Sequence, residues 1–139
     1  MNLLVDIGNS RIKWTRWNAR GAGRLHAVLY AKDNVSACLN AEWHKLKKPE
    51  QVWVANVAGK EVTDQLRQWT TAHWGIKPRF ATVSAVSGQV RNAYAEPGRL
   101  GVDRWLALLA AWRKYGTAAC IVDCGTAVTI DGLDGTGSH

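Results

Sequence analysis

The chain has 139 residues, of which 47% are hydrophobic and 21% are charged. This length is enough for one well-buried domain and too short for two complete ones, and the composition is typical of a globular protein. No apolar run approaches the roughly 18 residues that a membrane span needs, so we expect no membrane contact. The N-terminus has no basic region before its first apolar run and so no signal-peptide pattern. We expect a cytoplasmic protein.

The net charge of +7 and the sequence pI near 9.7 favour an anionic partner, such as a nucleotide, an acidic metabolite or a nucleic acid. The densest basic run, residues 45–48, is more typical of a solvated helix end than of a nucleic-acid patch. The spacing of Cys38, Cys120 and Cys124 matches neither a zinc site nor a disulfide framework, so we expect buried or partly buried free thiols. We expect most of the eight tryptophans in the core or in subunit contacts.

Three strand-like segments open the chain, and the short turns between them predict an antiparallel meander. These segments are residues 3–7, 12–17 and 25–31. A helix is expected to follow from about Val35 to Lys47. Asn34 can cap its first turn, and Pro49 stops the chain from continuing as a helix.

The middle of the chain alternates strand and helix patterns. Strands are expected at residues 51–57 and 79–83, and helices at residues 60–74 and 101–115, each helix being followed by a glycine. Residues 84–98 have no clear periodicity, which is typical of a binding loop. Antiparallel strands followed by crossover helices predict an α/β fold with a mixed sheet flanked by helices.

One short pattern occurs twice, as VDIGNS at residues 5–10 and as VDCGTA at residues 122–127. In each copy an apolar strand ends on an aspartate, a glycine follows after one residue, and a second strand begins after a small polar residue. Each copy therefore predicts a hairpin with Asp and Gly at its turn. Glycine can take a positive φ there and lets the backbone approach another group closely.

Two such hairpin tips facing each other would suit a polyphosphate with its metal ions. Backbone N–H groups and hydroxyls hold phosphate oxygens, and carboxylates hold cations directly or through water. The structural alternative is ordinary turn chemistry, in which Asp-x-Gly is common. The occurrence of a matched pair on matched strands favours the phosphate site.

Three motifs occur in order along the chain: DIGNS at residues 6–10, GVDRW at residues 101–105 and DCGTA at residues 123–127. Together they resemble the type III pantothenate kinases, in register over residues 2–139. Each motif alone is compatible with turn or helix-start chemistry. The resemblance therefore depends on the three motifs together, which are specific as a set.

The resemblance implies an actin-type fold, with a first ribonuclease-H-like domain at residues 1–116 and the opening β-hairpin of a second, incomplete domain at residues 117–139. It implies a transferase that uses ATP to phosphorylate the primary hydroxyl of pantothenate, giving 4'-phosphopantothenate in the first step of coenzyme A biosynthesis. It also implies a homodimer, a requirement for Mg²⁺ and activation by a monovalent cation, K⁺ or NH₄⁺.

The resemblance assigns roles position by position. Asp103 matches the general base, and phosphoryl transfer to an alcohol needs such a proton acceptor; an aspartate that favours the helix dipole is the structural alternative. The planar fork of Arg104 suits the carboxylate of pantothenate, with a surface salt bridge as its alternative. Asp123 matches a metal ligand, for the monovalent cation, or else stabilises its turn. Without the resemblance, Tyr94 would be read as a core or loop aromatic.

The positions that match ATP contacts are Asp6, Ile7, Gly8, Asn9, Ser10, Arg11, Ile12, Lys13 and Thr126. The positions that match pantothenate contacts are Tyr94, Gly101, Val102, Asp103 and Arg104. No role is assigned to the four histidines, because none falls in a motif: His26, His44, His73 and His139.

The sequence stops at His139 where the resemblance implies that family members continue, so most of the second domain is expected to be absent. We then expect the hairpin at residues 118–131 to be disordered or covered by a second copy, because a lone hairpin is marginal in water and an uncovered edge invites pairing. A non-catalytic dimerisation fragment is therefore one alternative function. A nucleic-acid-binding transcriptional accessory factor is another, although the sequence has no DNA-reading motif.

Overall fold

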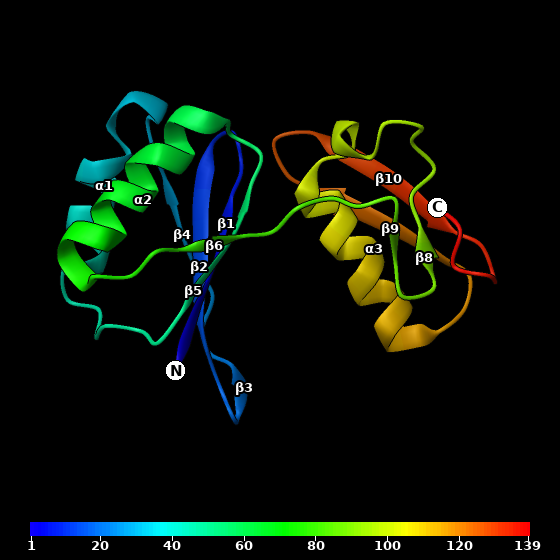
Figure 1. The fold of residues 1–139 in the computed structure, drawn as a ribbon, viewed down its shortest axis with the longest axis horizontal. Helices are drawn as coiled ribbons and strands as arrows, with labels where there is room; N and C mark the ends of the chain where they lie inside the picture. Colours follow the sequence, from blue (N-terminus) through cyan, green and yellow to red (C-terminus); the bar gives the residue numbers. More distant parts are fainter. The chain divides into compact units, whose positions relative to one another are not determined.

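The computed structural model describes residues 1–139 and separates into two units, Met1–Ala81 and Thr82–His139 (Figure 1). The elements of the first unit are β1 (Asn2–Ile7), β2 (Arg11–Asn18), β3 (Gly21–Ala22), β4 (His26–Leu29), the 3₁₀ turn η1 (Lys32–Asn34), α1 (Val35–Trp43), β5 (Val52–Asn56), α2 (Lys60–Trp74) and β6 (Arg79–Phe80). Those of the second are β7 (Val86–Ser87), β8 (Val90–Arg91), the 3₁₀ turn η2 (Pro97–Arg99), α3 (Val102–Tyr115), β9 (Ala119–Cys124) and β10 (Val128–Leu133).

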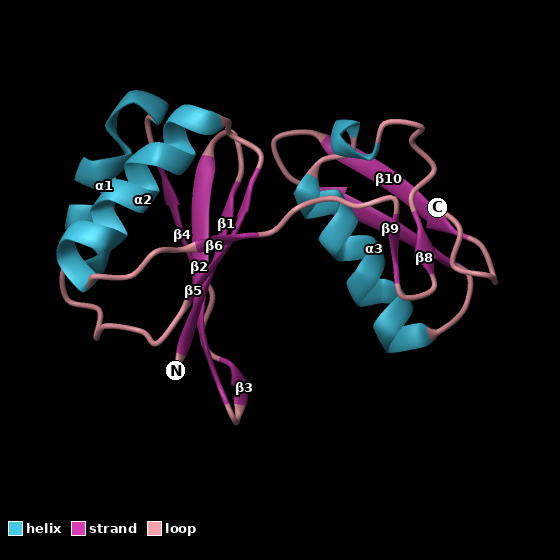
Figure 2. Ribbon diagram, in the orientation of Figure 1, coloured by secondary structure: helices cyan, strands magenta, loops and turns pink.

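A six-stranded mixed sheet forms the first unit, with the strand order β3-β2-β1-β5-β6 and with β4 paired to β2. β1 pairs antiparallel with β2, whereas β5 pairs parallel with both β1 and β6. The parallel pairs need crossover connections, which the chain makes through α1 and α2. Both helices lie on one face of this sheet (Figure 2). The predicted mixed sheet flanked by helices is confirmed.

An aromatic cluster forms part of the core of the first unit, beside aliphatic side chains of the sheet and helices. Trp43, at the end of α1, is fully buried and lies at its centre. Its ring stacks on Trp74 with centroids 5.6 Å apart. The rings of Trp14 and Trp69 meet it edge to face, at 6.0 and 5.7 Å. The expectation that tryptophans fill the core is confirmed for this cluster.

The predicted ends of the last two helices are confirmed. α2 has the predicted bounds, and α3 ends at the predicted residue. Gly75 and Gly116 follow them with the left-handed φ values of 66° and 62° that end a helix. Glycine adopts this conformation without steric cost, which explains why both helices stop there.

The first helix, α1, begins as predicted and ends early. Asn34 caps it, with its side-chain Oδ1 accepting a hydrogen bond from the Ala37 N–H at 3.2 Å. The helix ends at Trp43 rather than at Lys47. The reason is a tighter turn in which the Leu46 N–H donates to the carbonyl of Trp43 at 2.9 Å.

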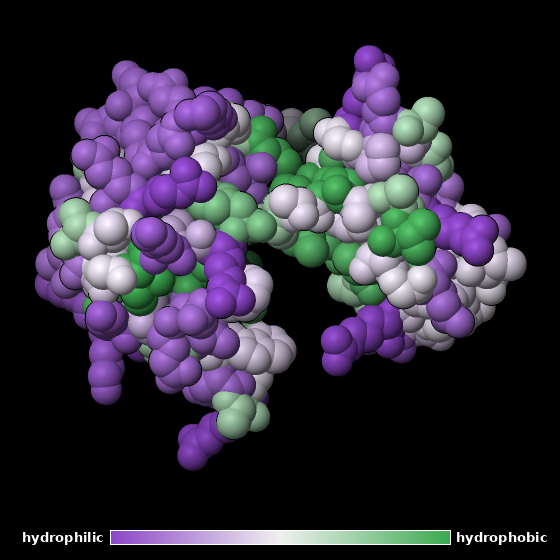
Figure 3. All heavy atoms as spheres, viewed as in Figure 1, coloured by the Kyte–Doolittle hydropathy of each residue, from purple (hydrophilic) through white to green (hydrophobic).

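The second unit is built on α3 and the β9–β10 hairpin. Trp105 and Leu108 of α3 pack with Leu133 of β10, and each is at most 4% exposed. The sequence predicts a hairpin that is disordered or covered by a second copy, whereas in the structure α3 of the same chain covers one of its faces. Coverage of the other face by a second copy stays a prediction. The opposite face carries the directly paired Val122 and Ile130, which are 56% and 67% exposed. Hydrophobic residues also reach the visible surface of this unit in patches (Figure 3).

The division into units differs from the predicted division into domains. α3 buries its apolar side against the hairpin, so along the chain the first unit ends at Ala81 and the second begins at Thr82, rather than the division falling after residue 116. The predicted limits concern the complete fold and stay a prediction. The loop expected at residues 84–98 contains the short β7–β8 hairpin and the start of the turn η2. None of the helices is both long and apolar enough to span a membrane.

Replacing Trp43 by alanine should destabilise the first unit by about 3–5 kcal/mol, because the lost indole leaves a cavity among three other aromatic rings. Urea unfolding followed by circular dichroism measures this loss. The matched control is Trp17→Ala, whose side chain is 46% exposed. Trp17→Ala should lower the free energy of unfolding by less than about 1 kcal/mol. Equal losses in the two variants would contradict the packing role of Trp43.

Candidate active site

The turn between β1 and β2 is the first copy of the repeated motif. Asp6 at the end of β1 pairs with Lys13 of β2, and Lys13 Nζ lies 3.4 Å from Asp6 Oδ2. Beyond this pair, the Gly8 N–H donates to the carbonyl of Arg11 at 3.0 Å and closes the tip. The predicted hairpin with Asp and Gly at its turn is confirmed.

Two residues that follow β4 fasten this tip, and sequence reasoning missed both. The hydroxyl of Tyr30 donates to the carbonyl of Gly8 at 2.8 Å, and the Tyr30 N–H donates to the carbonyl of Ser10 at 3.4 Å. Lys32 Nζ donates to Oδ1 of Asn9 at 2.8 Å. An ammonium group with a neutral partner therefore lies at the tip, which favours the binding of an anion. No local signal marks these residues, because they reach the tip through the pairing of β4 with β2.

The motif glycines do not adopt a positive φ, and this part of the prediction is wrong. A Cβ at Gly8 would lie 3.7 Å from the nearest atom, the carbonyl oxygen of Arg11. At Gly125 the corresponding distance, to the carbonyl oxygen of Ala127, is 3.8 Å. Both are ordinary van der Waals contacts, so the turns themselves do not require glycine. Close approach of another group to the backbone stays the predicted reason.

The turn between β9 and β10 repeats the closure of the first tip. The Gly125 N–H donates to the carbonyl of Ala127 at 3.0 Å. Asp123 pairs with Thr129 across the strands and is exposed, as is Thr126 in the tip. The second predicted hairpin is therefore confirmed. Because the two tips belong to different units, a shared phosphate site between them stays a prediction.

The first turn of α3 presents the candidate base and its neighbour. The carbonyl of Gly101 accepts the first helical hydrogen bond, from the Trp105 N–H at 3.0 Å. Asp103 Oδ1 accepts a hydrogen bond from the Arg104 N–H at 2.8 Å. This contact suits an aspartate that stabilises the helix start, and a carboxylate with a second oxygen can still accept a proton. Both interpretations of Asp103 stay open.

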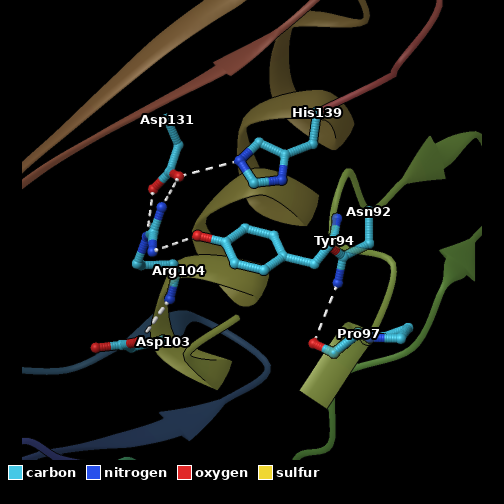
Figure 4. Close-up of polar contacts among 7 residues, drawn as sticks. All are labelled: Asn92, Tyr94, Pro97, Asp103, Arg104, Asp131 and His139. Atoms are coloured by element: carbon cyan, nitrogen blue, oxygen red, sulfur yellow. Dashed lines mark hydrogen bonds and ion pairs between the residues drawn. The ribbon is translucent and has the colours of Figure 1, made fainter. Parts of the chain in front are cut away.

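Arg104 binds an internal carboxylate, that of Asp131 on β10 (Figure 4). Nε and Nη2 donate to Oδ2 and Oδ1 of Asp131 at 3.0 and 2.5 Å, which is a bidentate pair. Nη1 donates to the hydroxyl of Tyr94 at 3.4 Å. Arg104 therefore does form a salt bridge, as in the alternative interpretation, but with a carboxylate that is only 4% exposed rather than with one at the surface. One edge of its fork is also already occupied.

A fourth side chain, His139, completes this cluster of Arg104, Asp131 and Tyr94 (Figure 4). Its Nε2 lies 3.1 Å from Oδ1 of Asp131, and its ring stacks on that of Tyr94 with centroids 6.0 Å apart. Sequence reasoning gave neither His139 nor Asp131 a role. The available signal was strand alternation: Asp131 lies two residues before Leu133 on the same inward face of β10, where a carboxylate needs a partner.

Hydrogen bonding sets the charge of this cluster. The hydrogen bond from Arg104 holds the pKa of Asp131 below its ordinary value, and that from His139 acts in the same direction against the effect of burial. The bond to Asp131 also raises the pKa of Arg104 above its ordinary value. Both side chains are therefore ionised at neutral pH, and they form a partly buried ion pair, in which Asp131 is buried and the Arg104 side chain is 26% exposed.

Several predicted contact residues are core residues. Ile7 and Ile12 are fully buried, and Val102 is 8% exposed. A ligand at these positions would therefore meet backbone atoms rather than side chains. Tyr94 lies in the loop before η2, where its N–H donates to Oδ1 of Asn92 at 3.0 Å and fixes the backbone.

The structure holds no group of three or more His, Cys, Asp or Glu side chains that could bind a metal ion together. Cys38, Cys120 and Cys124 are free thiols, as expected, but the last two are exposed rather than buried. A cation at Asp123 would therefore take its other ligands from backbone carbonyls, hydroxyls or a bound phosphate.

A family model described as type III pantothenate kinase matches residues 2–139. The chain belongs to the type III pantothenate kinase family. It is 44% identical over 144 residues to the type III pantothenate kinase of Nitrosococcus oceani, 38% over 135 residues to that of Nitrosospira multiformis, and 35% over 140 residues to that of Dichelobacter nodosus. These alignments cover 100%, 97% and 100% of this chain, and 54%, 50% and 56% of the three relatives. The chain spans about half the length of these type III pantothenate kinases.

Replacing Asp131 by asparagine should destabilise the second unit at pH 7 by about 1–3 kcal/mol, because Arg104 loses its charged acceptor in a partly buried position. The pKa of Asp131 is lowered by folding, so its contribution is present above the ordinary pKa of 3.8 and is lost as the pH falls through the folded value. Urea unfolding at several pH values measures the difference between the two proteins.

That difference should be constant from pH 7 down to about pH 5 and should narrow below about pH 4. Asp33→Asn, which changes an exposed aspartate of the first unit, is the matched control and should show little difference at any pH. A difference that persists unchanged into acid would mean that the charge of Asp131 is not its cause.

Proposed function

We propose that the complete protein containing this chain transfers the γ-phosphoryl group of ATP to the primary hydroxyl of pantothenate, giving 4'-phosphopantothenate and ADP. Family membership over residues 2–139 carries this proposal, because that range includes all three motifs. The relatives that match the chain are named type III pantothenate kinases. The reaction would be the first step of coenzyme A biosynthesis.

The β1–β2 tip would bind the phosphates of ATP. Lys13 and Lys32 bring two ammonium groups to it, and Gly8 leaves space beside the backbone for a phosphate oxygen. Fixed positive charge stabilises the transferring phosphoryl group, which carries its negative charge on peripheral oxygens. Thr126 of the β9–β10 tip would add a hydroxyl contact to ATP.

Asp103 would act as the general base. As the hydroxyl oxygen of pantothenate attacks the γ-phosphorus, the new O–P bond forms, the bond to the bridging oxygen of ADP breaks, and the hydroxyl proton passes to the carboxylate of Asp103. Gly101 and Val102 would contact the substrate through their backbone. Arg104 follows directly in the first turn of α3 and bonds to Tyr94, so both side chains can orient the same substrate.

Cations complete the proposed site. Mg²⁺ would neutralise the charge that develops on the phosphates. Asp6 and Asp123 are carboxylates next to the two tips, and they offer the oxygen ligands that hard cations prefer. Asp123 is exposed and would hold K⁺ or NH₄⁺. The proposal also includes an actin-type pairing of two domains, a homodimer and a cytoplasmic location.

Asp103→Asn in the complete protein should lower kcat by about 10²-fold or more and change KM for pantothenate less, because the amide keeps the shape but accepts no proton. A coupled assay of ADP release with ATP, pantothenate, Mg²⁺ and K⁺ measures both constants. Asp33→Asn is the control. A near-normal kcat would exclude Asp103 as the base, and a wild-type protein that leaves pantothenate unmodified would refute the function itself.

Asp123→Ala should abolish activation by K⁺ and leave a residual rate that does not respond to this ion. The physical reason is that the ion offsets phosphate charge only when an oxygen ligand holds it close to the phosphates. Rates are compared over a K⁺ titration, with a bulky organic cation keeping the ionic strength constant. Undiminished activation in the variant would remove Asp123 from the cation site.

A further inference from the structure

The cluster of Asp131 and His139 around Arg104 contains two residues that no motif includes. Asp131 accepts hydrogen bonds from two nitrogens of Arg104 and contacts Nε2 of His139, while being 4% exposed. Stability alone does not explain such a pair, because the cost of removing the two charges from water offsets much of their attraction. What a bidentate pair with a buried carboxylate does supply is a fixed orientation of the guanidinium group.

The geometry of Arg104 shows which of its groups remain for a ligand (Figure 4). Asp131 uses the edge formed by Nε and Nη2, and Nη1 donates to the hydroxyl of Tyr94. A guanidinium has five N–H groups, so these three bonds leave two, both at the Nη end. A planar fork that is clamped along one edge presents its remaining N–H groups in a fixed direction.

His139 is itself held by its backbone. Its N–H donates to the carbonyl of Arg91 at 3.0 Å, and the Arg91 N–H donates to the carbonyl of Gly137 at 2.9 Å. Gly137 has a φ of 88°, and a Cβ there would lie 2.6 Å from the carbonyl oxygen of Gln89, so glycine is required for this close approach. The imidazole is therefore placed by β8, and its ring lies against that of Tyr94.

We propose that Asp131 and His139 are positioning residues for pantothenate binding. They hold Arg104 and Tyr94 in the orientation that contacts the substrate, and they do not contact the substrate themselves. This inference rests on the proposed function and extends it to two further residues. Since Asp131 compensates the charge of Arg104, the arginine contributes direction more than attraction. Loosening the cluster should therefore weaken the binding of pantothenate more than it slows the transfer step.

The test uses the complete protein, with pantothenate varied at saturating ATP and with calorimetry of pantothenate binding. His139→Ala removes the ring nitrogen that meets Asp131 and should raise KM and Kd for pantothenate about tenfold or more, while kcat and KM for ATP change about threefold at most. His139→Gln places an amide nitrogen near the position of Nε2 and should restore most of this loss. Asp131→Asn should weaken binding at least as much as His139→Ala.

The matched control is His44→Ala, an exposed histidine whose Nδ1 contacts the carbonyl of Ala41 within its own segment. Circular dichroism establishes whether each variant is folded. If Asp131→Asn does not fold, the two His139 variants alone test the positioning role. Unchanged KM and Kd in His139→Ala would overturn the proposal, as would a loss confined to kcat or an equal loss in His139→Gln. A wild-type protein inactive on pantothenate would instead refute the proposed function, which is a distinct result.

Discussion

A carboxylate on the inward face of a strand has to be paired, and this constraint organises the second unit. Asp131 on β10 meets Arg104 on α3, so an ion pair joins hairpin and helix beside the apolar contacts of Trp105 and Leu133. The partners are 27 residues apart in the sequence, and their pairing joins the first turn of α3 to β10. The pair therefore fixes that turn relative to the strands. Asp103 lies in that turn. The position of the candidate base therefore depends on a residue outside every motif.

The structure of the two hairpin tips depends on both local sequence and tertiary contacts. In both, a glycine N–H donates to a carbonyl within the tip, which the repeated pattern alone is enough to produce. The first tip is also fastened by Tyr30 and Lys32, which β4 brings to it from a distant part of the sequence. Local sequence thus determines the shape of the tip, and the surrounding sheet determines its rigidity and charge.

The sequence predicts the fold well where local rules decide it. α2 is predictable to its ends because apolar residues recur at helical spacing and Gly75 stops it. α1 is predicted too long because no local sequence signal marks the turn at Leu46. The strands β7 and β8 are not predicted because two residues are too few to show a periodic pattern. The part of the candidate site that lies in the three motifs is also predictable from the sequence, because local spacing defines it. The other part, Asp131 and His139, depends on long-range contacts. Strand alternation places Asp131 on the inward face of β10 but does not identify its partner, and no spacing rule points to His139.

Attraction and orientation come from different parts of the chain. The charge of Arg104 is compensated by Asp131, so this cluster adds little long-range attraction for an anion. Lys32 has a neutral partner, Asn9, so this hydrogen bond leaves the charge of its ammonium group uncompensated at the first tip. A polyphosphate is held mainly by the number of charges around it, whereas a small substrate with one carboxylate is selected by the direction of a few donors. The tip suits the first kind of ligand, and the clamped guanidinium of α3 suits the second.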